Sequence, residues 1–417
     1  MDILTIQGGK TLHGELKISG SKNAALPILI ATLLTDERCT LRNVPYLDDI
    51  ETVIELLAFL GKKIVRDRDE IVVTAGSALQ AEAPYELVRK MRASIVVMGP
   101  LVARLKRVKV SLPGGCAIGG RPINIHLDGF RRLGATIELE QGYVDLKAEQ
   151  LKGARLPLEF PSVGATENLM MAASLIPGRT EIVHAAREPE IEDLSAFLNA
   201  MGARVTGAGS DHITIDGVER LHGAIHSVIP DRIECGTYMI AAAMTKGSLL
   251  LQHASASHLS ALIEKMEQAG IEIDAKDTTI RVKGPAKIRP VSLETAVHPG
   301  FPTDLQAQWI ALMAISSGVA QVTEQVFENR FMHLPELQRM GADIQTKGNT
   351  ATIRGVESLS GAEVMVSDLR AGAALVLAGL VAKGTTVIHR VYHLDRGYEH
   401  LEQKLSAVGA NITRSKE

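Results

Sequence analysis

The sequence predicts an α/β (α+β) fold of two domains, each built from three copies of one repeated unit. Three observations support this prediction: a length of 417 residues, a short phrase that recurs six times, and two kinds of apolar helix that alternate along the chain. A chain of this length exceeds what one ordinary hydrophobic core holds, so two domains are expected.

The recurring phrase places a glycine between a helical pattern and a strand pattern. Before the glycine, apolar residues recur with helical spacing, as in EIEDLSAFLNAMG, and after it they alternate with polar residues. A glycine in this place is expected to end the helix in the left-handed conformation, which costs glycine no steric strain. The glycines recur at intervals of roughly 70 residues; they are Gly61, Gly134, Gly202, Gly270, Gly341 and Gly409.

Two further elements complete each repeat. After the glycine come two strands joined by a tight polar turn, as in ARVTGAGSDHITIDG, whose alternation predicts one packed face and one face in water. Upstream lies a second helix that is apolar nearly all round, as in NAALPILIATLL and GATENLMMAASLI, which is typical of a helix surrounded by protein. We therefore expect the apolar helices inside each domain and the sheets outside.

The two ends of the chain are expected to pair. The sixth repeat stops at VGANITRSKE, before its second hairpin strand, and the N-terminus opens on an unpaired strand pattern, DILTIQG. Pairing predicts one domain over residues 21–229 and a second over residues 1–20 plus 230–417. The chain would then cross between domains twice, which predicts a hinge around a cleft.

Composition and charge exclude several classes of protein. A net charge of -3 argues against binding to nucleic acid or to an anionic membrane. The cysteines show no metal-binding spacing, and their odd number without a secretory leader favours reduced thiols. The uncharged stretch 305–323 carries several glutamines, so it does not predict a membrane span. We expect a cytoplasmic protein; the sequence indicates no oligomeric state.

Basic residues recur at equivalent places in different repeats, in the loops that precede helices. Helix N-termini carry unpaired N–H groups and a partial positive charge, so added cations there favour a site for phosphates or carboxylates. Alternatively, each cation pairs with a nearby acid such as Asp231, Glu188, Asp368 or Asp395. The cations are Lys22, Arg92, Arg232 and Arg370 before the buried helices, and Arg121, Arg187, Arg330 and Arg396 before the amphipathic ones.

Two segments depart from this pattern. FPTDLQAQ places Asp304 at the start of a buried helix, where it either caps the helix or acts as a general base. SVGATEN offers Ser162, Gly164 and Thr166, which either form a cap or donate hydrogen bonds to a bound group.

The loop SLPGGCAIGGRP, residues 111–122, is the longest of the equivalent connections. Its spacing matches neither GxxxxGK[ST] nor GxGxxG, which disfavours a nucleotide-phosphate loop. Two glycine pairs predict a flexible lid that carries Cys116, whereas Cys39 and Cys235 are expected to be structural.

Several motifs together resemble one known family. SGSKNAALP, PGGCAIGGRP, FPSVGATEN, AAREPEI, PDRIE, FPTDLQAQ, VFENRFMH and YHLDRGYE occur in order along nearly the whole chain. They are similar to the UDP-N-acetylglucosamine 1-carboxyvinyltransferase family of the EPSP synthase superfamily. The resemblance implies two inside-out α/β barrels, each of three βαβαββ units, that close over substrate.

The resemblance also implies an activity. The family transfers the enolpyruvyl group of phosphoenolpyruvate to the 3-hydroxyl of UDP-N-acetylglucosamine and releases phosphate, without metal or other cofactor. This is the first committed step of peptidoglycan biosynthesis, which serves cell shape and division, and it is the target of fosfomycin.

Residue roles follow from the same resemblance. Lys22, Arg121 and Arg396 would bind the phosphate and carboxylate of phosphoenolpyruvate, and Asp304 would be the general base. Cys116 would act as an acid, as a covalent nucleophile or in product release. Further substrate contacts would come from Asn23, Arg92, Pro122, Ile123, Asn124, Ile125, Ser162, Val163, Gly164, Val326 and Arg370, with support from Glu188, Asp231, Arg232, Arg330 and Asp368.

Two positions differ from some members of that family, and two other functions remain as alternatives. Phe160 stands where some members have lysine, and Asn124 stands where some have aspartate. EPSP synthase itself lacks a cysteine in the flexible loop, and a catalytically idle UDP-sugar-binding paralogue is expected to lose Lys22, Cys116 or Asp304.

Overall fold

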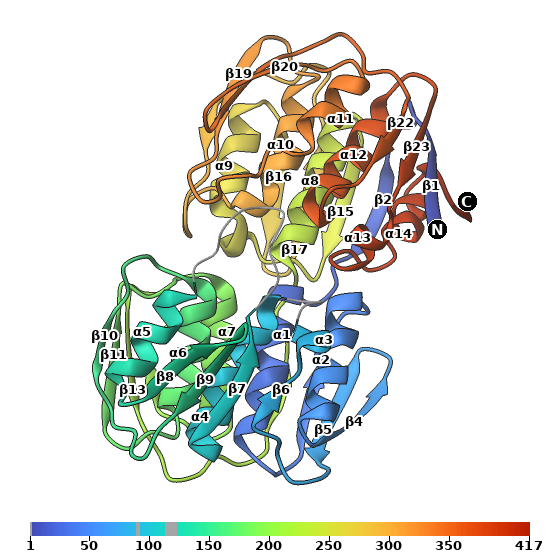
Figure 1. Cartoon of the computed structure of the whole chain (residues 1–417). Helices are drawn as coiled ribbons and strands as arrows, with labels where there is room; N and C mark the ends of the chain where they lie inside the picture. Colours follow the sequence, from blue (N-terminus) through green and yellow to red (C-terminus); the bar gives the residue numbers. More distant parts are fainter. Residues whose placement is uncertain (1, 89–91, 113–122) are drawn as a thin grey trace. The chain divides into compact units, whose positions relative to one another are not determined.

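The protein, described by a computed structural model, forms two compact units (Figure 1). The structure describes residues 2–88, 92–112 and 123–417, and of residues 92 and 93 only the backbone. In this part of the chain one unit spans residues 20–229, and the other contains residues 2–19 with residues 230–417. We call them the 20–229 unit and the 230–417 unit and describe each by itself.

Within the described residues, the 20–229 unit has three buried helices, three amphipathic helices and three sheets. The buried helices are α1 (Lys22–Ala31), α4 (Met98–Leu105) and α6 (Val163–Ala173); the amphipathic ones are α2 (Asp48–Phe59), α5 (Asn124–Arg132) and α7 (Pro189–Ala200). Shorter helices are η1 (Thr32–Leu34), α3 (Tyr85–Val88) and η2 (Arg92–Val97). In spatial order, the sheets are β14 (Ile225–Ser227), β3 (Cys39–Arg42), β5 (Glu70–Ala75) and β4 (Lys62–Asp67); β6 (Glu82–Ala83), β7 (Arg107–Ser111), β9 (Tyr143–Lys147) and β8 (Thr136–Glu140); and β10 (Arg155–Pro157), β11 (Arg179–Val183), β13 (His212–Asp216) and β12 (Val205–Thr206).

The 230–417 unit repeats this plan. Its buried helices are α8 (Arg232–Met244), α10 (Gln306–Met313) and α12 (Leu369–Val381), and its amphipathic ones are α9 (Ser260–Gln268), α11 (Leu334–Arg339) and α14 (Leu401–Ala407). Shorter helices are η3 (Ala256–Leu259), η4 (Thr303–Leu305) and α13 (Tyr392–Asp395). Its sheets are β2 (His13–Lys17), β15 (Ser248–Gln252), β17 (Thr279–Lys283) and β16 (Glu272–Lys276); β18 (Leu293–Glu294), β19 (Val319–Thr323), β21 (Thr350–Arg354) and β20 (Asp343–Lys347); and β22 (Glu363–Met365), β23 (Thr385–His389), β1 (Asp2–Gln7) and β24 (Asn411–Lys416).

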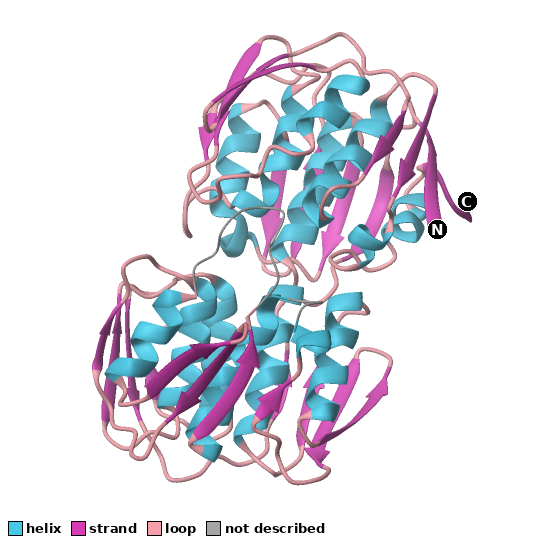
Figure 2. Ribbon diagram, in the orientation of Figure 1, coloured by secondary structure: helices cyan, strands magenta, loops and turns pink. Residues whose placement is uncertain are grey.

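Every sheet has the same internal order. Its first two strands are parallel and the other two neighbouring pairs are antiparallel, as in β10, β11, β13 and β12. The helices lie inside each unit and the sheets outside (Figure 2), as the sequence predicts. The sheets of a unit stay separate in the described chain, so the inside-out barrel is a ring of sheets around helices and not a closed ring of paired strands.

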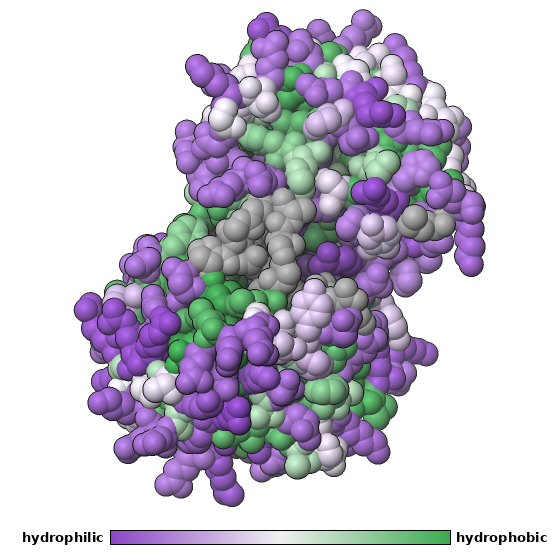
Figure 3. Space-filling model, viewed as in Figure 1, coloured by the Kyte–Doolittle hydropathy of each residue, from purple (hydrophilic) through white to green (hydrophobic). Residues whose placement is uncertain are grey.

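Burial follows the predicted alternation. In the hairpin strand β13 the residues alternate between exposed or half-buried and fully buried positions, whereas nearly every residue of α6 and α12 is buried. Each unit has its own hydrophobic cluster. The outer surface in Figure 3 is mostly hydrophilic. Among the described residues, no helix is both long and apolar enough to cross a membrane.

The repeat glycines adopt the predicted conformation. All six have positive φ, between 90° for Gly341 and 107° for Gly61. Each follows the end of an amphipathic helix, where a side chain on Cβ would be strained. The sequence prediction of these helix ends is confirmed.

The N-terminal strand completes the last sheet of the chain. β1 lies between β23 and β24 and is antiparallel to both, with Leu4 opposite Ile388 on one side and Arg414 on the other. Leu4 and Ile6 are fully buried. The predicted pairing of the two ends is therefore present.

One predicted helix begins later than expected. ASIVVMGPLVARL runs as the 3-10 helix η2 and becomes α-helical only at Met98. Pro100 has no N–H to donate to the preceding turn, so an uninterrupted α-helix through this point would lack one of its bonds.

Candidate active site

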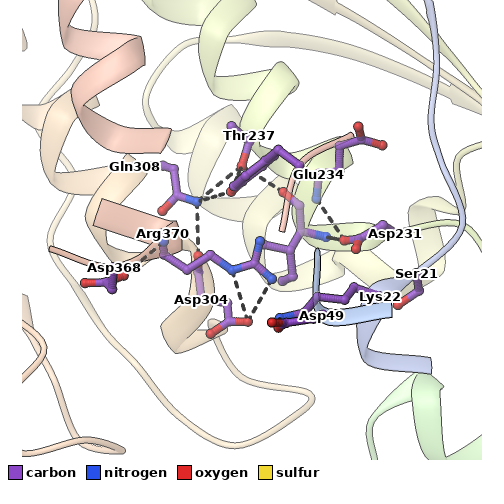
Figure 4. A network of polar contacts seen from close by, with 12 residues as sticks. Ser21, Lys22, Asp49, Asp231, Glu234, Thr237, Asp304, Gln308, Asp368 and Arg370 are labelled. Atoms are coloured by element: carbon purple, nitrogen blue, oxygen red, sulfur yellow. Dashed lines mark hydrogen bonds and ion pairs between the residues drawn. The ribbon is translucent and has the colours of Figure 1, made fainter. Parts of the chain in front are cut away.

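Asp304 and two arginines form an ionic cluster in the 230–417 unit. Asp304 lies in η4, directly before α10. Its Oδ1 accepts a hydrogen bond from Arg330 Nη2 at 2.7 Å, and its Oδ2 accepts from Arg370 Nη2 at 3.1 Å and Nε at 3.3 Å. Figure 4 shows the Arg370 contact. Asp304 therefore does not act as the helix cap that was one of its two predicted roles; Leu305 occupies the N-cap of α10.

The members of this cluster differ in burial and sum to a positive charge. The side chains of Arg330 and Arg370 are 5% and 2% exposed, against 26% for Asp304. These three side chains carry one net positive charge, although the Asp231 carboxylate also attracts Arg370. The cluster thus suits an anionic ligand that approaches beside Asp304.

A buried polar network holds Arg370 in place. Asp368 caps α12 by accepting from the backbone N–H of Arg370 at 2.9 Å. The Arg370 guanidinium lies over the Tyr398 ring, 5.3 Å from its centroid. Burial works to lower the pKa of Arg370, but Tyr398 and Asp304 raise it overall, so the guanidinium stays charged.

Helix α10 carries a second arm of the same network. Gln308 Nε2 lies within hydrogen-bonding distance of Tyr398 Oη at 3.1 Å, Thr237 Oγ1 at 3.2 Å and the Asp304 carbonyl at 3.1 Å. All three buried helices of the unit therefore contribute to the surroundings of Asp304. The sequence did not single out Tyr398, Gln308 or Thr237, because an apolar helix with an occasional polar residue gives no signal of which polar residues meet.

His333 lies next to this cluster and is uncharged at neutral pH. It precedes α11 and is 1% exposed. Burial lowers the pKa of its imidazole to about 4, although nearby Asp368 raises it. A neutral imidazole adds no further charge beside Arg330.

Lys22, at the start of α1 in the 20–229 unit, forms an ion pair with Asp49 of α2. Ser21 caps α1 by accepting from Ala24 N, and Lys22 follows as the first helical residue. Lys22 Nζ lies 3.2 Å from Asp49 Oδ2, and both side chains are buried. Asp49 was missed from the sequence because an acid in the first turn of a helix, here α2, is an ordinary stabilising feature.

The SVGATEN segment begins α6. Ser162 caps the helix by accepting from Ala165 N at 3.3 Å, and Thr166 Oγ1 donates to the Ser162 carbonyl at 2.9 Å. A Cβ on Gly164 would lie 3.5 Å from His126, which Asn168 contacts at 3.0 Å. The capping role predicted for Ser162 is therefore present in the structure.

Acidic residues gather at the start of α7. Glu188 is half-buried at the N-cap of α7, next to Glu190, which is buried. Burial, followed by the charges of Glu190 and Glu188, raises the pKa of Glu167 well above its usual value. These surroundings favour the protonated form of Glu167.

The remaining predicted residues lie at loop and helix ends. Asp231 caps α8 through the N–H groups of Ile233 and Glu234. Other predicted residues that are half-buried are Asn23, Ile123, Ile125, Val163, Arg232, Val326 and Arg396, whereas Asn124 is exposed. Cys116, Arg121, Pro122 and the side chain of Arg92 lie outside the described residues.

The other two cysteines are buried, as expected of structural residues. Burial raises the pKa of both Cys39 and Cys235, which disfavours the reactive thiolate. Within the described ranges, no group of three or more His, Cys, Asp or Glu side chains is placed to hold a metal ion.

Comparison with known proteins decides the family. The sequence model of the EPSP synthase family (3-phosphoshikimate 1-carboxyvinyltransferase) matches residues 6–405. A protein of Endomicrobium trichonymphae named UDP-N-acetylglucosamine 1-carboxyvinyltransferase is 54% identical over 413 residues, 99% of each chain. One of the same name from Geobacter metallireducens is 53% identical over 417 residues and the full length of both chains. This chain belongs to the UDP-N-acetylglucosamine 1-carboxyvinyltransferase family.

Solved structures agree with this membership. The enolpyruvyl transferase NikO from Streptomyces tendae has a TM-score of 0.90 at 25% identity and covers 100% of this chain and 99% of its own. EPSP synthase from Acinetobacter baumannii has a TM-score of 0.79 at 18% identity, which shows a shared fold. Relatives named UDP-N-acetylglucosamine 1-carboxyvinyltransferase match at 53–54% identity over essentially the full chain, so the resemblance seen in the sequence motifs is confirmed.

Proposed function

We propose that this protein transfers the enolpyruvyl group of phosphoenolpyruvate to the 3-hydroxyl of UDP-N-acetylglucosamine and releases phosphate. The observation that carries the proposal is an identity of 53–54% over the whole chain to transferases of that name. The ionic cluster around Asp304 gives the proposal a chemical basis.

The proposed reaction has two stages. First, C3 of phosphoenolpyruvate gains a proton while the sugar oxygen adds to C2 and gives up its own proton, forming a tetrahedral intermediate. Second, C3 loses a proton and the C2–O bond to phosphate breaks, which restores the enol double bond. Negative charge moves onto the departing phosphate, so fixed cations close to it lower the barrier.

Asp304 is the proposed base for the sugar hydroxyl. Arg330 and Arg370 bind different oxygens of its carboxylate and so fix its orientation. It is the most exposed member of the cluster, which makes it the one that a substrate reaches first. The surplus positive charge of the two arginines suits the carboxylate of phosphoenolpyruvate.

The other predicted residues take roles that stay proposals. Lys22, Arg121 and Arg396 bind phosphoenolpyruvate, while Asn23, Arg92, the segment 121–125, the segment 162–164 and the backbone at Val326 bind the UDP-sugar. Glu188, Asp231, Arg232 and Asp368 support them. Cys116 acts as an acid, forms a covalent adduct or assists product release, and it is the proposed site of alkylation by fosfomycin.

The cellular setting is also part of the proposal. We infer that the protein acts in the cytoplasm, where phosphoenolpyruvate is available, in peptidoglycan synthesis and thereby in cell shape and division.

A coupled assay tests the function. Phosphate release from phosphoenolpyruvate is expected only when UDP-N-acetylglucosamine is present, and Asp304→Asn is expected to lower kcat by a factor of about 100 or more because the base is lost. Fosfomycin is expected to add one adduct to the wild type and none to Cys116→Ala, as read by intact mass. Release with shikimate 3-phosphate, or with no acceptor, contradicts the assignment.

A further inference from the structure

Glu324 is a buried carboxylate that accepts hydrogen bonds from two different loops. It follows strand β19 and is 3% exposed. Its Oε2 accepts from Thr303 Oγ1 at 2.8 Å. Its Oε1 accepts from Thr295 Oγ1 at 2.8 Å and from the backbone N–H groups of Val326 at 2.8 Å and Phe327 at 3.1 Å.

These partners connect two parts of the proposed active site. Thr303 directly precedes Asp304 and begins η4. Val326 supplies the backbone proposed to contact the UDP-sugar. One side chain therefore fixes both the loop that carries the base and the loop that meets the acceptor, and hydrogen bonds to a charged acceptor are the stronger kind.

Comparison among the repeats shows that this arrangement is a departure. In four other repeats the residue that follows the equivalent strand has a left-handed backbone: Asn43, His184, His253 and Arg390, with φ of 56°, 60°, 56° and 60°. Glu324 does not adopt this conformation.

In two of these repeats the side chain at this position bonds to the residue that follows the neighbouring parallel strand. Asn43 Nδ2 donates to the carbonyl of Val228, just after β14, at 2.8 Å. The His184 ring lies 3.0 Å from the carbonyl of Leu158, just after β10. Glu324 keeps the corresponding tie through Thr295, just after β18, and adds the bonds to Thr303, Val326 and Phe327. The added bonds are those that lead toward the proposed site.

We propose that Glu324 is a positioning residue that couples the placement of Asp304 to the substrate loop at Val326. The proposal rests on the proposed function. The bond to Thr303 serves the rate of the chemical step, and the bonds to Val326 and Phe327 serve binding of the UDP-sugar. Removing only the bond to Thr303 or only the bonds to the loop is therefore expected to change either kcat or KM, and removing the carboxylate is expected to change both.

Three variants separate the effect of the Thr303 bond from the effect of the bonds to Val326 and Phe327. Thr303→Val keeps the shape of the side chain and removes one hydroxyl, so kcat is expected to fall about tenfold with the KM for UDP-N-acetylglucosamine within twofold of wild type. Glu324→Ala is expected to lower kcat and also to raise that KM about tenfold. Glu324→Gln keeps one carbonyl oxygen for the loop N–H groups, so it is expected to recover most of the KM.

Asn43→Gly is the matched control, because it removes the corresponding bond in another repeat and glycine tolerates the left-handed backbone. Its melting temperature is expected to fall without the split between kcat and KM. The dissociation constant of UDP-N-acetylglucosamine, measured by calorimetry, gives a second measure of the bonds to Val326 and Phe327.

The outcomes are distinguishable. Wild-type enzyme without release of phosphate in the presence of UDP-N-acetylglucosamine overturns the proposed function. Wild-type turnover, with Thr303→Val leaving kcat unchanged or altering kcat and KM equally, overturns the role of Glu324 alone. Should Glu324→Ala fail to fold, Thr303→Val, which removes a single hydroxyl, still decides.

Discussion

The buried guanidinium groups of Arg330 and Arg370 bind the two oxygens of the Asp304 carboxylate, and two uncharged side chains adjoin them. His333 is neutral, and Tyr398 presents its ring face to Arg370. The sequence predicted Asp304 and Arg370 as site residues because each occupies a repeated place before a helix. It did not single out Asp49 or Glu324, because residue type and local spacing do not show that Asp49 contacts Lys22 or that Glu324 contacts Thr295 and Thr303.

The pKa of His333 predicts how stability depends on pH. Its folded pKa, about 4, lies below the unfolded value of 6.5, so between these values the unfolded chain binds a proton that the folded chain does not. This contribution to stability is present above pH 6.5 and is lost as the pH falls toward 4. Between pH 7 and pH 5 the loss from this residue is about 2 kcal/mol.

Urea unfolding of the wild type and of His333→Asn at both pH values measures this effect. The variant keeps an amide donor but has no group that titrates in the range, so its free energy of unfolding is expected to fall less than that of the wild type. An equal fall in both proteins would show that His333 is not the residue responsible.

The buried helices approach one another closely because they carry small residues at their contacts. An added Cβ at Gly99 of α4 would lie 2.2 Å from the carbonyl oxygen of Asn168 in α6, and one at Gly236 of α8 would lie 2.7 Å from Leu305 Cδ1. The sequence predicted these helices from their uniform apolar character. It did not predict the 3-10 start before α4, because the missing N–H of Pro100 acts on hydrogen bonding, which an apolar pattern does not report.

Gly236→Ala tests the packing between α8 and η4. The new methyl group would press on Leu305 and Leu262, so the free energy of unfolding is expected to fall by roughly 1–3 kcal/mol. Because Leu305 follows Asp304, kcat is expected to fall as well.

The double variant Gly236→Ala with Leu305→Ala provides the control. Leu305→Ala opens the space that the methyl group needs, so the two changes together are expected to cost less than the sum of the single changes in denaturant unfolding. Strict additivity would mean that the two side chains do not meet as described.

The two units share a plan but differ in how their sheets are completed. In the 20–229 unit, β14 from the end of the segment pairs with β3 near its start. In the 230–417 unit, β1 and β2 come from the beginning of the chain. The repeat and its glycines made this arrangement predictable. The last repeat lacks the second strand of its hairpin and the N-terminus begins with an unpaired strand, so the simplest arrangement pairs the two. No comparable sequence pattern indicates which side chains contact one another in the candidate active site.

Deleting residues 2–7 tests the importance of β1. Its loss removes a strand paired on both sides and the fully buried Leu4 and Ile6. We expect amides in β23, β24 and α12 to lose protection in hydrogen exchange, while those of α4 and α6 stay protected because they belong to a separate hydrophobic cluster. Equal loss of protection in both sets would show that the two units fold as one.

The position of β1 between β23 and β24 also sets the order in which the chain is completed during translation. Strand β1 is made first, but β24 follows it by roughly 400 residues, an interval of about 20–80 s at ordinary rates of synthesis. All three sheets of the 20–229 unit use strands from within that segment, so they can assemble while the ribosome is still making the second half. A nascent chain that has just exposed residue 229 can therefore complete the three sheets of the 20–229 unit, while β1 still has neither of its partners, β23 and β24.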